Sequence, residues 1–172
     1  MKLLLNWLCK KLIAKYEEEF PDGTPIVVAC EYGRFEDVKL LISRRNDVNG
    51  SNGNNNNNMT LKEYVNQVGK ASYGLERTPL MIAAGEEHFQ IVKYLIEQGE
   101  ADPNIANSGG SNALHFAARL NRTNTELIQL LLTHMPLDSI NKTTDWAGST
   151  PLDCAYYNNR SSIQQEIIAL LR

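Results

Sequence analysis

Apolar residues recur along the chain at the spacing of short helices, and the clearest case lies near its middle. Residues 78–84 read Thr-Pro-Leu-Met-Ile-Ala-Ala, in which the threonine suits the cap of a helix and the proline suits its first turn. Residues 91–96 carry apolar side chains at the same spacing, and Gly99 suits a helix end in the left-handed conformation. Helices this short cannot bury their apolar faces alone, so the pattern predicts neighbouring copies of the pair.

Three other segments align with residues 78–84, namely residues 24–30, 112–118 and 150–156. The steps between successive segments are 54, 34 and 38 residues. With a period of about 33 residues, the first step holds an insertion of roughly 21 residues. Over residues 20–172 the chain thus resembles ankyrin repeats. The resemblance implies an all-α fold, a solenoid of stacked helix-turn-helix units with β-hairpin-like turns and an N-terminal capping helix.

We expect a single domain over residues 1–172. Its expected parts are a capping helix (1–19), repeat 1 (20–45), an Asn-rich insertion (46–73), repeat 2 (74–106), repeat 3 (107–144) and repeat 4 (145–172). Residues 46–58 offer almost no apolar side chain, so we expect a mobile loop there.

The second half of the insertion predicts a short helix. Thr60-Leu61-Lys62-Glu63 matches a capping box, in which the first and fourth side chains bond each other's backbone N–H groups. The residues predicted to share one helical face are Leu61, Tyr64, Val65 and Val68. We therefore expect this helix to dock back on the array.

The repeats depart from the family pattern at a few positions. The glycine that usually lies between the two helices is Gly33 in the first repeat, but Glu87 takes its place in the second, where we expect an altered turn. Asn112 replaces the usual threonine and still suits an N-cap, whereas Asp153 replaces the usual histidine of the fourth repeat. The resemblance implies that His115 bonds neighbouring turns.

Residues 1–16 read as a helix with most of its lysines off an apolar stripe, which consists of Met1, Leu4, Leu5, Leu8 and Leu12. We favour a capping helix over the first repeat, because a stacked array exposes an apolar side at its end. The alternative is a basic amphipathic helix on a membrane surface, where Trp7 suits the interface. A secretory signal is disfavoured, because polar residues interrupt the apolar run and no small-residue cleavage site follows.

The composition restricts the possible partners and the cellular location of the protein. The net charge of −3 gives no general attraction to nucleic acid, so we expect no nucleic-acid partner. Three cysteines without a CxxC spacing predict buried, reduced thiols, hence a cytoplasmic or nuclear location. We expect a monomer. The chain closes on apolar residues 167–171 without a polar cap, which is typical of an unusual terminus or of a segment of a longer protein.

Motifs for chemistry are missing from the sequence. It contains no HExxH, no Gly-rich phosphate loop and no Cys/His cluster, so we predict no metal, no cofactor and no enzymatic activity. His88 and His134 read as surface residues at a turn and a helix end. We therefore expect a protein-binding module or scaffold that uses the concave face of the stack. The alternative is a membrane-associated adaptor that uses the N-terminal basic helix.

The resemblance also implies which positions meet the partner: turn residues just before each helix pair, and exposed residues near the end of each first helix. Carried onto this sequence, the candidates are Glu31, Tyr32, Leu75, Arg77, Glu86, Ser108, Ser111, Arg119, Leu120, Trp146, Ser149, Tyr157 and Asn158. Arginine and the aromatic residues among them are the types enriched at binding hot spots.

Overall fold

The computed structural model describes residues 2–21, 23–48, 59–70, 76–120, 125–145, 147–157 and 162–172. The elements in chain order are α1 (Lys2–Glu19), α2 (Pro25–Glu31), α3 (Phe35–Val48), α4 (Leu61–Asn66), β1 (Gly69–Lys70), β2 (Glu76–Arg77), α5 (Pro79–Gly85), α6 (Phe89–Glu97), α7 (Ala113–Leu120), α8 (Thr125–His134), α9 (Leu137–Ile140), α10 (Pro151–Tyr157) and α11 (Ser162–Leu170).

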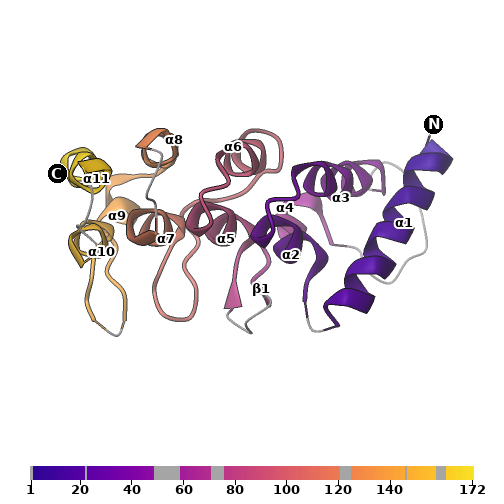
Figure 1. Ribbon diagram of the computed structural model, residues 1–172, viewed down its shortest axis with the longest axis horizontal. Helices are drawn as coiled ribbons and strands as arrows, with labels where there is room; N and C mark the ends of the chain where they lie inside the picture. Colours follow the sequence, from indigo (N-terminus) through magenta and orange to yellow (C-terminus); the bar gives the residue numbers. More distant parts are fainter. Residues whose placement is uncertain are drawn as a thin grey trace.

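Pairs of antiparallel helices stack side by side into an elongated row (Figure 1). The first helices of the pairs, α2, α5, α7 and α10, pack against one another in that order, and the second helices α3, α6, α8 and α11 form a parallel row. The connection between α6 and α7 and the described part of the connection between α9 and α10 project from the same edge of the row as finger-like loops (Figure 1). The fold is therefore the predicted all-α solenoid, and its one described strand pair is the two-residue ladder of β1 and β2.

The first helices begin where the sequence places caps. Thr78 Oγ1 accepts a hydrogen bond from Met81 N at 3.2 Å, and Asn112 Oδ1 accepts from Leu114 N at 3.1 Å. Asp153, which replaces the usual histidine, returns a carboxylate bond to Thr150 N at 2.8 Å and so completes a capping box. Each substitution in the pattern thus preserves a satisfied helix start.

Small side chains let the first helices lie close together. Ala83 and Ala84 in α5 and Ala117 and Ala118 in α7 have no exposed surface, and α5 packs directly against α7. The second helices contribute larger apolar side chains, such as Leu95, to the same continuous core. Each pair thereby buries the face that it cannot bury alone.

The turn between α5 and α6 is not altered, so our expectation for Glu87 is wrong. Glu87 takes the left-handed conformation (φ 62°) that Gly33 takes in the first repeat (φ 65°). The turn hydrogen bonds also match: Glu87 N donates to Ala84 O at 3.4 Å and Gly33 N donates to Cys30 O at 3.4 Å. The backbone geometry is kept although the side chain disfavours it.

The end of α6 also differs from the prediction. Glu100, and not Gly99, takes the left-handed conformation (φ 57°). Glycine is required at position 99 for another reason, because an added Cβ would lie 2.8 Å from the carbonyl oxygen of Leu95.

The insertion docks on the array as predicted, through α4. Its capping box forms, with Glu63 N donating to Thr60 Oγ1 and Thr60 N donating to Glu63 Oε2. Asn66 ties α4 to the second repeat, because its Nδ2 donates to Glu100 O at 2.9 Å and its Oδ1 accepts from Asp102 N at 2.7 Å.

Two details of the insertion differ from expectation. Val68, assigned to the buried face, is 45% exposed, because the helix ends at Asn66. Residues 46–48, assigned to the mobile loop, continue α3, whereas residues 49–58 lie outside the described residues.

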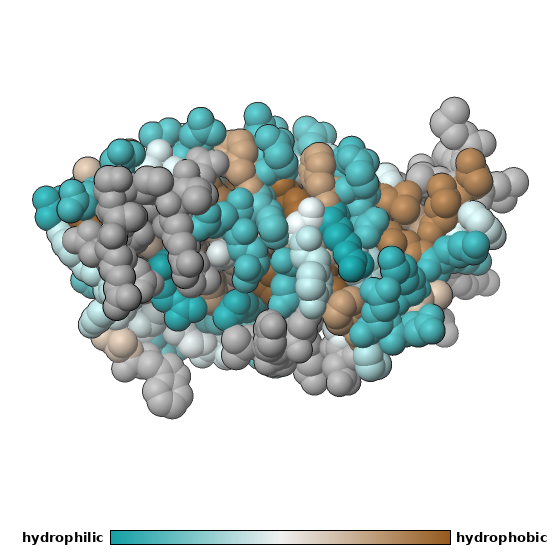
Figure 2. All heavy atoms as spheres, in the orientation of Figure 1, coloured by the Kyte–Doolittle hydropathy of each residue, from teal (hydrophilic) through white to brown (hydrophobic). Residues whose placement is uncertain are grey.

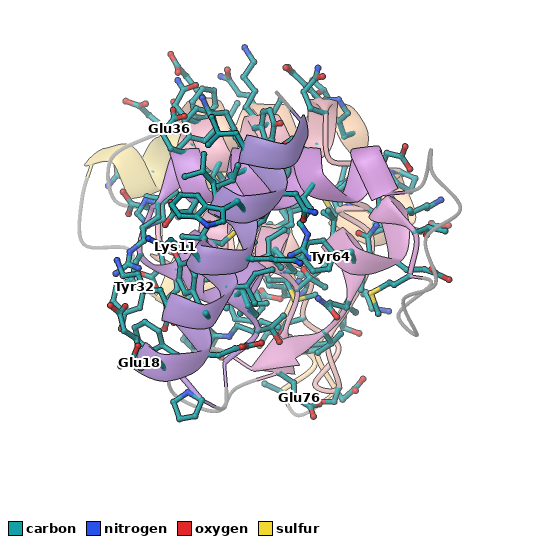
Figure 3. The ribbon with its side chains drawn as sticks, turned by 90° about the vertical axis from the view of Figure 1, so that its right-hand side faces the viewer. Lys11, Glu18, Tyr32, Glu36, Tyr64 and Glu76 are labelled. Carbon is teal, nitrogen blue, oxygen red and sulfur yellow. The ribbon has the colours of Figure 1, made fainter. Side chains whose placement is uncertain are left out.

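Helix α1 lies across the N-terminal end of the stack and packs on α2 and α3 (Figure 3). The predicted stripe is only partly buried: Leu12 packs against the core, whereas Leu4 and Leu8 are exposed. The side chains of Met1 and Leu5 lie outside the described residues. The most buried side chains of α1 are those of Cys9 and Tyr16. Tyr16 Oη donates to Asp37 Oδ2 at 2.8 Å, which anchors α1 to α3. Since this helix is apolar on two sides, periodicity alone wrongly assigned Leu4 and Leu8 to the buried face.

The outer side of α1 stays exposed: Leu4 is 61%, Trp7 53% and Leu8 42% exposed. In Figure 2 apolar side chains gather at this end of the molecule, over α1. Lys11 lies over the Trp7 ring, with its Nζ 4.3 Å from the ring centroid.

Candidate functional site

A hollow of about 470 Å³ lies where the fingers of the third and fourth repeats meet helices α7 and α10. Its walls come from three consecutive repeats: β2 precedes the second pair, the finger of residues 107–111 precedes the third, and the finger of residues 144–149 precedes the fourth. The hollow is therefore a product of stacking, since no single repeat encloses it.

Phe116 is the aromatic centre of the hollow, and two arginines lie against it. The Cζ atom of Arg77, from the second repeat, lies 4.5 Å from the centroid of the Phe116 ring, and the Cζ atom of Arg119, one turn further along α7, lies 6.0 Å from it. Phe116 is 6% exposed, Arg77 is half-buried and Arg119 is exposed. Guanidinium groups are attracted to the face of an aromatic ring, so Phe116 orients both.

Burial lowers the pKa of Arg77, and the positive charge of Arg119 lowers it further. Glu86 and Glu31 act in the opposite sense, each with a smaller effect than Arg119. The guanidinium of Arg77 thus lies in a partly desolvated place, where it feels the like charge of Arg119 and the opposite charges of Glu86 and Glu31.

The finger of the third repeat is held by the side chain and the backbone of Asn107. Asn107 Oδ1 accepts from Gly109 N at 3.1 Å and from Ser111 N at 3.0 Å, while Asn107 N donates to Ser111 O at 2.9 Å. Gly110 has φ 77°, and an added Cβ there would lie 3.0 Å from Asp145 Oδ1 of the next finger. Neighbouring fingers therefore pack closely, which gives the hollow a rigid rim.

His115 joins the third and fourth repeats, as predicted. Its Nε2 lies 3.2 Å from Ser149 O in the finger of the fourth repeat. Its Nδ1 lies 2.8 Å from Asn112 Oδ1 and 3.2 Å from Asn112 N. Burial lowers the pKa of His115, which favours the neutral form of the ring.

Cys154 lies on α10 at the wall of the hollow and is half-buried. Burial raises the pKa of its thiol, and the charge of Arg119 opposes that rise. All three cysteines are described, and they form no disulfide bond. A thiol with a raised pKa is a poor nucleophile, so Cys154 reads as part of the wall.

The structure brings six of the predicted partner-binding residues together around this hollow: Arg77, Ser108, Ser111, Arg119, Ser149 and Tyr157. Tyr157 is 78% exposed and Ser108 is exposed, as a contact surface requires. Ser149 differs from the prediction, because it is only 9% exposed. Its carbonyl accepts from Thr144 N and His115, which places it at the base of the finger and not at the tip.

Other predicted residues do not line the hollow. Glu31 and Tyr32 lie at the end of α2 in the first repeat, and Glu86 is exposed just after α5. Tyr32 packs on Phe20, with ring centroids 5.4 Å apart. Leu75, Trp146, Asn158 and the side chain of Leu120 lie outside the described residues.

Sequence reasoning missed Phe116, the residue that organises the hollow. Its position after His115 reads as core, and it is indeed nearly buried. The available signal was its i, i+3 relation to Arg119 on one face of α7, which places a ring and a guanidinium side by side. The contact of Arg77 with Phe116 could not be predicted from the sequence, because Arg77 belongs to another repeat.

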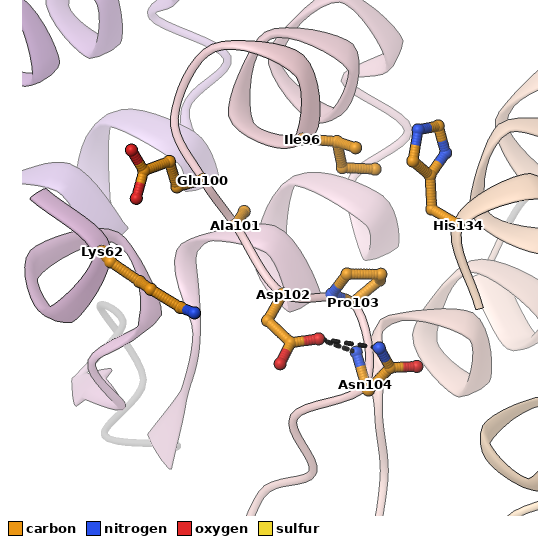
Figure 4. A pocket seen from close by; sticks show the side chains of 8 residues that line it. All are labelled: Lys62, Ile96, Glu100, Ala101, Asp102, Pro103, Asn104 and His134. Atoms are coloured by element: carbon orange, nitrogen blue, oxygen red, sulfur yellow. Dashed lines mark hydrogen bonds between the residues drawn. The ribbon is translucent and has the colours of Figure 1, made fainter. Parts of the chain in front are cut away.

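A second hollow, of about 430 Å³, lies on the side of α4 and is bordered by Lys62, Asp102, Asn104 and His134 (Figure 4). Asp102 Oδ1 accepts from Asn104 N at 2.9 Å and from Asn104 Nδ2 at 2.8 Å, an arrangement that closes the turn after α6. The side chains of Asp102 and Asn104, joined by dashed lines in Figure 4, thus serve the turn itself.

Comparison with known proteins agrees with the geometry. A family model described as ankyrin repeats (3 copies) matches residues 2–107, 51–134 and 99–171. No curated protein matches the chain. Among the described residues, no helix has the length and apolar character needed to cross a membrane, and no cluster of His, Cys, Asp and Glu has the arrangement of a metal site.

Proposed function

Because the chain belongs to the ankyrin-repeat family, we propose that it is a non-enzymatic binding module that holds a partner protein against the hollow around Phe116. Members of this family are generally protein–protein interaction modules and typically lack enzymatic activity. Our proposal further specifies the binding face, which is the hollow around Phe116, and the residues that line it.

The observation that carries the proposal is the convergence of three repeats on one hollow whose rim is rigid. The hydrogen bonds of Asn107 within the finger of residues 107–111, and the bond from Asp145 N to Gly109 O at 3.1 Å, hold the rim before any partner arrives. A preorganised surface loses little conformational entropy on binding. Arg119 and Tyr157 stand at this rim, and their residue types supply much of the binding energy at protein interfaces.

The test uses neighbouring tyrosines of α10 as a matched pair. Tyr157 lines the hollow, whereas Tyr156 packs with Arg172 at the C-terminal end and does not line it. The intact chain and the variants Tyr157→Ala, Ser108→Arg and Tyr156→Ala are used for affinity capture with quantitative mass spectrometry.

We expect proteins captured by the wild-type chain to be lost by Tyr157→Ala and Ser108→Arg and kept by Tyr156→Ala. Circular dichroism checks that each variant keeps its helical content. Capture that is equal for all four chains would rule out the hollow as the binding face.

A second candidate function is favoured by one observation, the exposed apolar side of α1. Leu4, Trp7 and Leu8 lie beside the exposed lysines Lys10 and Lys11, a combination that associates with anionic lipid surfaces. In this case α1 holds the repeats at a membrane surface as an adaptor. Co-sedimentation with vesicles of phosphatidylserine and phosphatidylcholine tests it: wild type must pellet and a Trp7→Glu variant must not. A wild-type chain that stays in the supernatant excludes this function.

A further inference from the structure

Several polar groups in the wall of the hollow around Phe116 are already hydrogen-bonded within the protein. Asn107 Oδ1 accepts from two backbone N–H groups of its own finger, and Thr144 Oγ1 accepts from Ser149 N at 3.1 Å. His115 Nε2 lies 3.2 Å from Ser149 O. A partner that bonds one of these groups must first break an existing bond, so the exchange yields little net free energy.

The charge of Arg77 is also compensated within the protein. Its Cζ atom lies 4.5 Å from the centroid of the Phe116 ring, and the opposite charges of Glu86 and Glu31 act on it. Arg77 thus has an aromatic contact and favourable charges nearby before any partner binds. Recognition at the hollow therefore does not depend on an added ion.

The surface that a partner can still bury in the hollow is mainly apolar. Apolar atoms line more of the hollow than polar atoms do. They belong in part to Tyr157, which is 78% exposed, to the half-buried Cys154 and to the exposed Ala147. Removing apolar surface from water is favourable in proportion to its area, so a large apolar side chain gains more here than a polar one.

We propose that the hollow binds an aromatic side chain of the partner protein as its anchor. This inference rests on the proposed function and names the chemistry of the partner. Three groups of the wall attract an aromatic ring more strongly than an aliphatic side chain: the ring of Tyr157, the guanidinium of Arg119 and the sulfur atom of Cys154. Arg119 already makes one such contact, since its Cζ atom lies 6.0 Å from the centroid of the Phe116 ring.

The open mouth of the hollow indicates a side chain of a protein and not a small molecule. Small-molecule sites enclose about 70–90% of the surface of their ligand. Here three residues of the lining, Ser108, Ala147 and Tyr157, are exposed. A volume of about 470 Å³ accommodates the ring of one side chain, while the backbone of the partner stays outside and continues across the fingers.

The test selects peptides without prior assumption about their composition. Short random peptides displayed on phage are selected on the intact chain and, in parallel, on the variant Ser108→Arg, which places a bulky side chain at the mouth of the hollow. The parallel selection corrects for any general preference of the library for aromatic residues. The best binders of the wild-type chain are synthesised, and each is also prepared with its aromatic residues replaced, one at a time, by leucine.

Affinities of these peptides are measured by fluorescence polarisation for wild type, Tyr157→Ala and Arg119→Gln. A matched control is Lys93→Gln, which removes one positive charge from α6, where Lys93 pairs with Glu97 away from the hollow. Labelling of Cys154 by iodoacetamide, with and without saturating peptide, reports where the peptide binds, because Cys154 lies in the wall.

We expect the binders of wild type to share an aromatic residue that the binders of Ser108→Arg lack. Its replacement by leucine should weaken binding about threefold or more, and Tyr157→Ala should weaken binding about tenfold or more. Arg119→Gln should weaken binding of the aromatic peptide about threefold but leave its leucine form unaffected, whereas Lys93→Gln should change neither. Bound peptide should slow the labelling of Cys154. Both Arg119 and Tyr157 are exposed, so their variants keep the fold.

The other outcomes separate this inference from the proposed function. Peptides that protect Cys154 but bind through an aliphatic or polar residue would refute the aromatic anchor and keep the binding face. Peptides that bind Tyr157→Ala and Ser108→Arg as tightly as wild type, and that leave the labelling of Cys154 unchanged, would refute both. A selection that yields no binder above background also counts against both.

Discussion

Glu87 lies at the turn between α5 and α6 in a conformation that an L-residue disfavours, so its replacement by glycine should stabilise the protein. Its φ of 62° nearly equals the 65° of Gly33 in the equivalent turn of the first repeat. A side chain in this conformation costs about 1–2 kcal/mol relative to the right-handed one. Glycine removes that cost but makes the unfolded chain more flexible, which returns about 0.5–1 kcal/mol. The expected net gain is about 0.5–1 kcal/mol.

Comparing Glu87→Gly with Glu87→Ala isolates the backbone effect. Alanine removes the carboxylate and its contacts but keeps the Cβ that causes the strain. Urea unfolding followed by circular dichroism should therefore rank the free energy of unfolding as Gly above Ala, by about 1 kcal/mol, which corresponds to about 2–4 °C in Tm.

The reverse substitution, Gly33→Ala, provides the opposite sign. It imposes the same conformational cost, and the new Cβ would lie 2.6 Å from Cε1 of His88, whose Nε2 bonds the carbonyl of Glu31. The ring cannot move away without weakening that inter-repeat bond, so we expect a loss of about 2 kcal/mol. Equal stability of Glu87→Gly and Glu87→Ala would refute the reasoning, because the left-handed backbone would then carry no measurable cost.

Three further predictions follow from other contacts. The pKa of His115 is lower in the folded protein than its unfolded value of about 6.5, so the stabilisation by the neutral ring is fully present above that value and is lost as pH falls through the folded pKa. Between about pH 7.5 and 5.5, wild type should therefore lose more free energy of unfolding than His115→Gln. A similar pH dependence in the variant would contradict this. Iodoacetamide should modify the half-buried Cys154 before the buried Cys9 and Cys30, as peptide mass spectrometry of a time course will show. Earlier labelling of either buried thiol would count against the described packing. Asn66→Ala should lower the free energy of unfolding by about 1–3 kcal/mol, because it removes the two bonds that tie α4 to the second repeat; an unchanged urea midpoint would show that these bonds contribute nothing net.

Features that depend on residues close in sequence were predictable. A threonine followed by proline starts a helix wherever it occurs, and Thr60 with Glu63 forms its capping box without help from the rest of the chain. His115 was predictable from the family pattern, and its bond to Ser149 follows from the constant spacing of neighbouring repeats. The capping box of Thr150 and Asp153 carries the same local signal, since the carboxylate lies three residues after the threonine.

The inner face of α1 was not predictable, because two faces of this helix are apolar. Leu4 and Leu8 satisfy helical periodicity as well as Cys9 and Tyr16 do, yet only the second set is buried. The choice depends on the shape of the surface that α2 and α3 present and on a polar partner for Tyr16, which Asp37 supplies. Neither is encoded within α1 itself.

The sequence by itself determined the repeating helix pairs, their caps and the docked helix of the insertion, because each depends on side chains a few residues apart. Only the tertiary structure decided the rest. Stacking forces the turn at Glu87 into the geometry of a glycine turn, since both helices of the pair must meet their neighbours at a set distance. Stacking also brings Arg77 of one repeat onto Phe116 of the next and buries Ser149 beneath His115. The candidate site belongs to the spaces between repeats, and those spaces exist only once the array has formed.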